Sequence, residues 1–219
     1  MRLAICAVLL ALVLPAAAVA ARDPMAPRQH HTAADMKRAK AIALRRSDLT
    51  AGWKLNPPAK PNPPCTAGPD ESKLVQTAKV DPSFTWKDGV TNVGSEVDIF
   101  RTAAGARQDW RATTLSLLEA CLLQSARAGA AKTVRVRILS ADALAAPKGA
   151  ERSLHYRLVF ALRSTRTVHL VVEVLALGRG RVTVVLHTLT AQTPLPASVV
   201  KALTRVLASR LGAGHGITA

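Results

Sequence analysis

The feature that most constrains this chain is a series of four consecutive segments in its second half, each with the alternating pattern of a β-strand. The segments are rich in β-branched residues and cover 133–140, 152–163, 166–177 and 181–190. Such alternation is typical of strands with one buried face. The links Ser164–Arg166 and Gly178–Gly180 are short enough to be β-hairpins. The last three segments are therefore predicted to form an antiparallel ribbon that turns twice.

The same alternation assigns an inward face to these strands. The residues predicted to point inward are Tyr156, Leu158, Phe160, Leu162, Val168, Leu170, Val172, Val174, Val182, Val184 and Leu186. With three-residue links, Arg157 should lie opposite Glu173 as an ion pair, and Glu173 should lie opposite Val185. The other face would then gather Thr183 with six residues that we predict to line a ligand-binding cleft: His155, Arg157, His169, Glu173, Arg181 and His187. The alternative is an ordinary solvated sheet face.

Three further helices and two further strand regions are predicted around this ribbon. The helices cover 32–46, 103–129 and 194–214, and the strands lie within 72–87 and at 95–102. The first helix has a capping signal at Thr32 and Asp35, and the second should place Cys121 on its buried stripe. The order α-β-β-α-β-β-β-β-α predicts an α+β fold, with a central antiparallel sheet of about six strands and helices packed on its faces. We expect one domain over 32–211 and a flexible tail over 212–219.

The N-terminus has the pattern of an export signal. A basic residue, an apolar stretch and a small-residue cleavage site follow one another within residues 1–20. The apolar stretch is too short to span a bilayer, and no second apolar segment approaches that length. Residues 21–31 are polar and proline-containing, as in a disordered leader. We therefore expect a secreted, extracytoplasmic protein without a transmembrane anchor after cleavage.

Two cysteines, Cys65 and Cys121, remain once the signal with Cys6 is removed. An even pair in an oxidising compartment predicts a disulfide, and two buried free thiols are the alternative. The bond would close a loop of about 57 residues and stabilise the fold by roughly 4 kcal/mol. Neither cysteine has a second ligand at zinc-finger spacing, so we predict no metal site. Five prolines between 57 and 64 stiffen the loop that leads to Cys65.

The formal net charge of +16 indicates anionic surroundings, such as cell-wall polymers or acidic lipid head groups. Specific nucleic-acid binding is not expected, because the chain offers only three Trp, three Phe and one Tyr as stacking platforms. The sequence contains no Gly-x-Ser-x-Gly elbow, no His-Glu-x-x-His helix and no P-loop. We therefore predict no enzymatic activity and no cofactor.

A resemblance to a known family is carried by the segments 45–53, 93–110 and 117–123. They read RRSDLTAGW, VGSEVDIFRTAAGARQDW and LLEACLL. They resemble small secreted proteins and lipoproteins of actinobacteria that are similar to the extracellular sensor domain of a bacterial Ser/Thr kinase, and more distantly to the PsbP-like α/β/α sandwich. The motifs are Asp48-Leu49 with Gly52-Trp53, the strand that ends at Phe100, Ala106 with Trp110, and the Cys65/Cys121 pair.

The resemblance implies a central antiparallel sheet with helices on its faces, a ligand cleft and no catalysis. Together with the polar strand face, it favours a secreted cell-envelope binding module that is sensor-like and holds a small, amphiphilic or lipid-like anionic ligand. One alternative is a basic interaction protein that adheres to acidic cell-wall polymers. A second alternative is a hydrolase without a recognisable motif.

Overall fold

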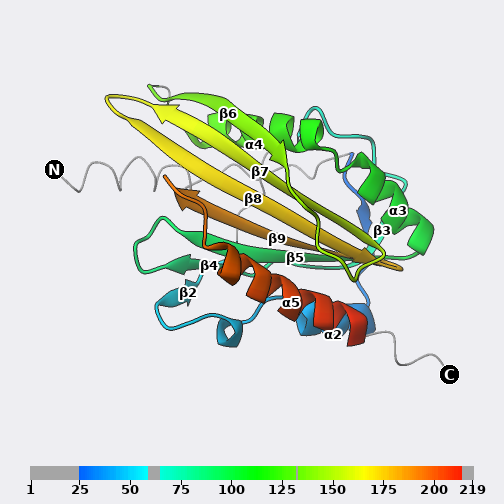
Figure 1. The fold of residues 1–219 in the computed structure, drawn as a ribbon. Coiled ribbons are helices and arrows are strands. Elements are labelled where there is room, and N and C mark those ends of the chain that lie inside the picture. The colour runs from blue at the N-terminus through cyan, green and yellow to red at the C-terminus, as the bar shows by residue number, and fades with distance from the viewer. Residues whose placement is uncertain (1–24, 59–64, 132, 214–219) are drawn as a thin grey trace.

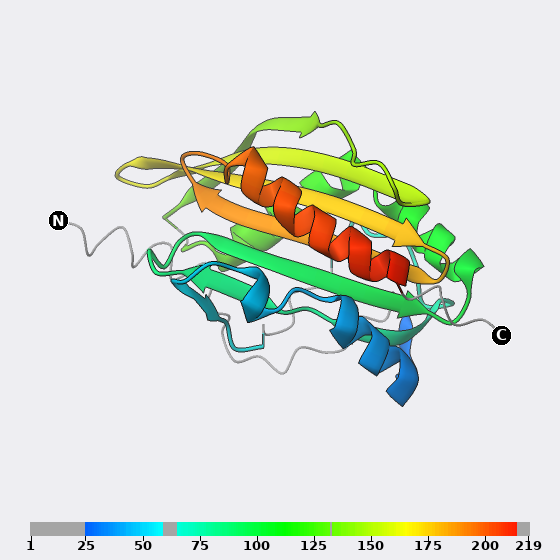
Figure 2. The same cartoon turned by 60° about the horizontal axis from the view of Figure 1, so that its bottom comes forward.

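The computed structural model describes residues 25–58, 65–131 and 133–213, and the predicted export signal lies outside them. These residues form three layers, with a central sheet between two pairs of helices (Figures 1 and 2). The sheet has nine strands in the order β1-β3-β5-β9-β8-β7-β6, and the short β2–β4 pair attaches to β5 through β4. The predicted α+β class is confirmed, whereas the sheet has more strands than expected.

The elements are bounded as follows. The strands are β1 (Arg28–Gln29), β2 (Trp53–Leu55), β3 (Val75–Val80), β4 (Ser83–Trp86), β5 (Asn92–Phe100), β6 (Arg135–Ala143), β7 (Arg152–Arg163), β8 (Thr167–Arg179) and β9 (Val182–Ala191). The helices are α2 (Ala33–Ile42), the short 3-10 helix η1 (Arg46–Asp48), α3 (Ala103–Ala112), α4 (Leu115–Gly129) and α5 (Ala197–Ala213).

The twice-turned ribbon is present, but one of its two registers differs from the prediction. Strands β7 and β8 place Arg157 opposite Glu173, as expected. Strand β8 continues to Arg179, which pairs with Val182, so only two residues link β8 to β9. Glu173 therefore lies opposite Thr188 and not opposite Val185. A shift of three residues is odd, so every side chain of β9 points to the opposite face from the one predicted.

Helices cover both faces of the sheet. On one face, here called the α2/α5 face, Leu175, Leu177 and Val184 belong to a large core with residues of both helices. On the other, the α3/α4 face, Leu158 and Phe160 form a second core with side chains of α4. Figure 2 shows α5 and α2 in front of the strands and the green helices α3 and α4 behind them. Because helices pack on both faces, a polar side chain on the covered part of the sheet lies between the sheet and a helix layer.

The long helix predicted over 103–129 is interrupted at Thr113 and Thr114 and forms the two helices α3 and α4. Thr114 caps α4, because its hydroxyl accepts a hydrogen bond from the Leu117 amide at 3.2 Å. The break changes which face of α4 meets the sheet. The residues that pack on the second core are Leu115, Leu122, Leu123 and Ala126. The prediction that Cys121 lies on the buried stripe is therefore wrong, whereas the predicted end at Gly129 is confirmed.

Smaller differences concern the first third of the chain. Helix α2 begins after its predicted cap, Thr32, but ends at Ile42 and not at residue 46. The region 72–87 contains two strands, β3 and β4, where one was predicted. Part of the predicted disordered leader is ordered, because β1 runs parallel to β3 and the Arg28 amide donates to the Leu74 carbonyl at 2.9 Å. A two-residue strand offers too little pattern to be recognised in a sequence.

None of the helices in the described ranges has the length and apolar character needed to cross a membrane.

Candidate functional site

A row of polar and charged residues crosses the sheet on the α3/α4 face. Its members are successive cross-strand partners on β3, β5, β9, β8 and β7: Lys79, Asp98, Thr183, Gly178 and Arg152. Directly opposed residues of neighbouring antiparallel strands point to the same face, so these side chains lie next to one another. Helix α3 packs against β5 and β9 at this level of the sheet. We call this set the polar row.

One end of the polar row is a compact group of opposite charges. The Lys79 ammonium lies 2.7 Å from a carboxylate oxygen of Glu96 and 3.7 Å from Asp98. The Gln76 side-chain amide donates to Asp98 at 2.6 Å. Side chains of Lys79 and Glu96 remain about one third exposed, whereas Asp98 is almost buried. Solvent therefore reaches this end of the row from the side of Lys79 and Glu96.

Carboxyl groups outnumber the cations at this end of the polar row, and the pKa values of these carboxyl groups are shifted. Burial raises the pKa of Asp98 well above its usual range, and repulsion by Glu96 adds to the effect. Burial also opposes the charge of Glu96, but Lys79 outweighs it and keeps the pKa of Glu96 below its usual value. Burial and then Glu96 raise the pKa of Asp109, on α3, to about 6. Of the two neighbouring carboxyl groups, Asp98 is therefore the one whose pKa is raised and Glu96 the one whose pKa is lowered.

The other end of the polar row is Arg152, whose side chain lies flat across Gly178. A Cβ atom at Gly178 would come within 2.7 Å of the Arg152 Nε, so only glycine leaves room for this arrangement. The Trp110 ring of α3 covers the guanidinium at 5.6 Å from its centroid. The Nη2 group donates to the Gly180 carbonyl at 3.2 Å. Within the described part of the chain, the buried Nε has no hydrogen-bond partner.

The middle of the polar row is Thr183. Only 6% of this residue is exposed. Its hydroxyl is buried and makes no hydrogen bond to any residue that the structure describes. A buried polar group without a partner costs free energy, of the order of 1–3 kcal/mol. The row therefore combines, on one face, two neighbouring carboxyl groups with a hydroxyl and a guanidinium N–H that have no hydrogen-bond partner among the described residues.

The six residues predicted as a ligand site do not form a single site. Four of them share the α2/α5 face: His155, Arg157, His169 and Glu173. His187 lies on the opposite face, because the register of β9 differs from the prediction. Arg181 lies in the β8–β9 turn, where its guanidinium donates to Asp35 at 3.1 Å and to the Phe100 carbonyl at 2.8 Å. The prediction of one shared polar face is therefore wrong.

The predicted ion pair between Arg157 and Glu173 is confirmed. The Arg157 Nε and Nη2 atoms both donate to one carboxylate oxygen of Glu173, at 2.7 and 2.5 Å. The Glu173 side chain is only 4% exposed, against 36% for Arg157. The two charges of the pair neutralise each other, as expected for an ion pair with a structural role in a packed layer.

His187 packs on the α3/α4 face near the acidic end of the polar row. Its ring lies directly over Gly94, the residue opposite it on β5. Burial lowers the pKa of His187 below its ordinary value, although Glu96 and Asp81 oppose the shift. The imidazole is therefore neutral at physiological pH, and it closes this side of the row with an uncharged ring.

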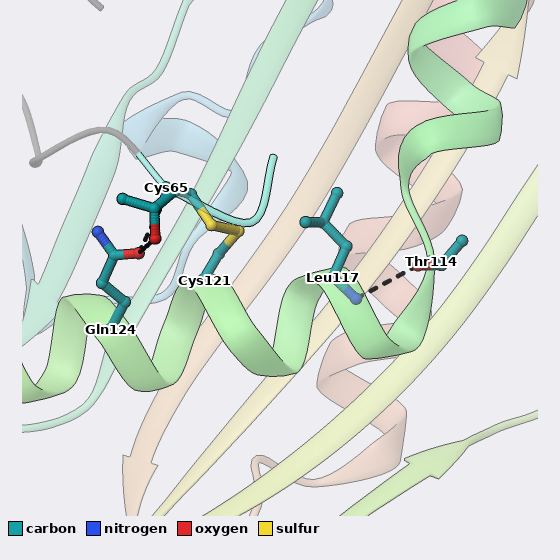
Figure 3. The surroundings of a disulfide bond; sticks show 6 residues. Cys65, Thr114, Leu117, Cys121 and Gln124 are labelled. Carbon is teal, nitrogen blue, oxygen red and sulfur yellow. Dashed lines mark hydrogen bonds between the residues drawn. A yellow bond between two sulfur atoms is a disulfide. The ribbon is translucent and has the colours of Figure 1, made fainter. Parts of the chain in front are cut away.

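The predicted disulfide between Cys65 and Cys121 is present, with Cα atoms 5.2 Å apart. Figure 3 shows it joining the loop after the prolines to α4, one turn before Gln124. The amide and the hydroxyl of Thr66 both donate to the Gln124 side-chain oxygen at 3.1 Å. A wide, shallow depression of about 430 Å³ adjoins this loop and the start of α4 at Leu117. No buried charged side chain lines it, so we assign it no ligand.

The residues of the acidic end were not identified from the sequence, although a pattern for them exists. Glu96 and Asp98 alternate with the buried Val97 and Ile99. Such alternation is normally interpreted as a solvated face. In the structure α3 packs against β5, and on this face Asp98 is buried and Glu96 is partly exposed. Among the described residues, no three His, Cys, Asp or Glu side chains are arranged to hold a metal ion.

Comparisons with known proteins yield similarity to solved structures alone. No family model matches the chain, and no curated protein matches its sequence. Among solved structures, the chain is similar to the crystal structure of the extracellular domain of PknH from Mycobacterium tuberculosis. The TM-score is 0.47 and the identity 12%, over 81% of this chain and 95% of that one.

Proposed function

We propose that the chain is an extracytoplasmic, non-enzymatic binding module of the cell envelope and that the polar row holds its ligand. The Cys65–Cys121 disulfide supports an oxidising compartment. The observation that carries the proposal is the Thr183 hydroxyl, which lies between Asp98 and Gly178 in the row and is buried without a partner among the residues that the structure describes. A ligand hydrogen bond would satisfy it. We assign no reaction to the site.

The chemistry of the two ends indicates the class of ligand. The Nε of Arg152, which has no partner in the described part of the chain, favours an anionic group such as a carboxylate or a phosphate. The carboxyl groups of Glu96 and Asp98 favour a group that donates hydrogen bonds, such as an ammonium or a hydroxyl. Two strand spacings, together about 10 Å, separate Gly178 from Asp98. An amphoteric molecule of the size of an amino acid or an amino sugar fits this span.

The first test is whether such a ligand is retained and stabilises the protein. We expect native mass spectrometry of protein purified from its own envelope to show an added mass. In a thermal-shift panel of amino acids, amino sugars and their phosphates, one class should raise the melting temperature by several degrees. The variant Thr183→Val should lose that rise, since it removes the hydroxyl and keeps the shape of the side chain.

A matched control is available on the other face of the sheet. The Thr190 hydroxyl is also buried and lacks a partner among the described residues, but it lies on the α2/α5 face. The variant Thr190→Val should therefore bind the same compound as the unmodified protein. An equal loss in both variants would contradict the proposal, as would a protein with no retained mass and no response to any compound of the panel.

A further inference from the structure

The outer surface of α2 and α5 carries charge of only one sign. The two helices contact each other on the same face of the sheet, at the front of Figure 2. Six basic residues on these helices, in the short link to η1 and at the start of η1 are exposed: Lys37, Lys40, Arg45, Arg46, Lys201 and Arg205. Helix α5 contains no acidic residue at all. We call this surface the basic helical layer.

The acidic residues of this region are turned inward and are already neutralised. Asp35 accepts hydrogen bonds from Arg181 and from the Thr77 hydroxyl, at 3.1 and 2.6 Å. Asp48 accepts two from the Arg210 guanidinium, at 2.6 and 2.8 Å. Their side chains are only 13% and 8% exposed. Among the described residues of α2, η1 and α5, no ion pair joins an exposed cation of the layer to an acidic residue, although Arg45 lies near Asp48 and helps to lower the pKa of that carboxyl.

We propose that the basic helical layer is a docking surface for a linear polyanion, such as a phosphate- or carboxylate-bearing envelope polymer. A row of cations gains affinity by releasing the counter-ions of the polymer. A membrane surface is the other anionic partner, but interfacial helices insert large apolar side chains. On the two helices of the layer only Val199 is a large exposed apolar residue, with 37% of its surface accessible. This surface lies on the opposite side of the sheet from the polar row and does not depend on a ligand there.

The test compares two variants of the full chain with equal charge. The first, Lys37→Gln with Lys40→Gln, Lys201→Gln and Arg205→Gln, removes four cations of the layer. Arg45 and Arg46 are kept, because each also donates to a backbone carbonyl. The control replaces four exposed arginines at the far end of the sheet with Gln: Arg135, Arg137, Arg163 and Arg166. Exposed substitutions of this kind change stability little.

Binding is measured on immobilised inorganic polyphosphate at several salt concentrations. We expect the unmodified protein and the control to bind with similar affinity, and the layer variant to bind about tenfold more weakly or worse with a reduced salt dependence. Equal weakening of both variants would mean that net charge alone acts, and would overturn the proposal. So would a protein that ignores polyphosphate, or one that binds only vesicles containing an anionic phospholipid.

Discussion

At the scale of single residues, the buried polar atoms without partners are the most informative feature of this molecule. Thr183 and Thr190 each bury a hydroxyl that no described residue satisfies. Because the group costs about 1–3 kcal/mol when unsatisfied, we expect each of Thr183→Val and Thr190→Val to increase the free energy of unfolding of the ligand-free protein by about 1 kcal/mol. Urea denaturation measures the change. Destabilisation by either variant would show that its hydroxyl makes a hydrogen bond after all.

The contact between Gly94 and His187 leads to a second prediction at this scale. A Cβ atom at Gly94 would lie 2.3 Å from the His187 Nε2 and 3.1 Å from the Pro82 carbonyl. We therefore expect Gly94→Ala to destabilise the protein by about 1–3 kcal/mol through overpacking. In a double-mutant cycle the same substitution should cost clearly less when His187→Ala is present. A cost independent of residue 187 would refute the contact.

The raised pKa of Asp109 predicts a specific pH dependence. Its folded-state pKa of about 6 lies above the ordinary value near 3.9, because of burial and then of Glu96. Between these values the folded state binds more protons than the unfolded state, so this group lowers stability as pH rises from about 4 to about 6. We expect Asp109→Asn to be more stable than the unmodified protein at pH 7, with the difference shrinking toward pH 4. A pH-independent difference in chemical denaturation would contradict the raised pKa.

In the ion pair of Arg157 and Glu173, the carboxylate is buried and the guanidinium is partly exposed. The two substitutions that break the pair should therefore cost different amounts of stability. Removing Arg157 leaves a carboxylate that is only 4% exposed without its partner. Removing Glu173 leaves a guanidinium that water already reaches. We therefore expect Arg157→Met to cost about 3 kcal/mol of stability and Glu173→Gln clearly less. Equal losses in urea denaturation would show that solvent compensates both charges alike.

At the scale of elements, the alternating pattern predicts a strand well when the strand has one apolar face and one polar face. The bounds of β7 agree with the predicted 152–163, and the Arg157–Glu173 pairing follows from one short hairpin link. The register of β9 was not predictable in the same way. Gly178 and Gly180 both allow a turn, and the segment 182–186 is apolar or β-branched on both faces. Without a polar face to expose, alternation does not fix which side of β9 meets which helix layer.

The disulfide predicts a difference between two helices. Helix α4 contains no fully buried residue, whereas α5 buries five. Removing the bond with Cys65→Ser and Cys121→Ser should lower the free energy of unfolding by roughly 4 kcal/mol. The bond joins residues 56 positions apart, and without it the unfolded chain is less restricted. In hydrogen exchange, the amides of α4 should lose more protection than those of α5. An equal or greater loss in α5 would show that the bond does not act through α4.

At the scale of the whole molecule, folding brings together charged residues that are far apart in the sequence. The formal net charge of +16 is spread over the chain, with no basic cluster in the sequence to mark a surface. The three-layer arrangement brings α2 and α5 together and collects exposed cations on one side of the sheet. The same arrangement brings Lys79, Glu96 and Asp98 together on the other side of the sheet, where α3 packs against β5. Neither surface could be derived from the sequence, because each joins segments more than 15 residues apart.

The polar row exists only if β9 pairs with β5 and β8 in the observed register, and cross-strand backbone NOEs measured by NMR report that register directly. We predict NOEs that connect Thr183 to Asp98 and to Gly178, and Glu173 to Thr188. NOEs between Glu173 and Val185 would instead turn the other face of β9 toward α3. That result would remove Thr183 from the row and contradict the proposed ligand site.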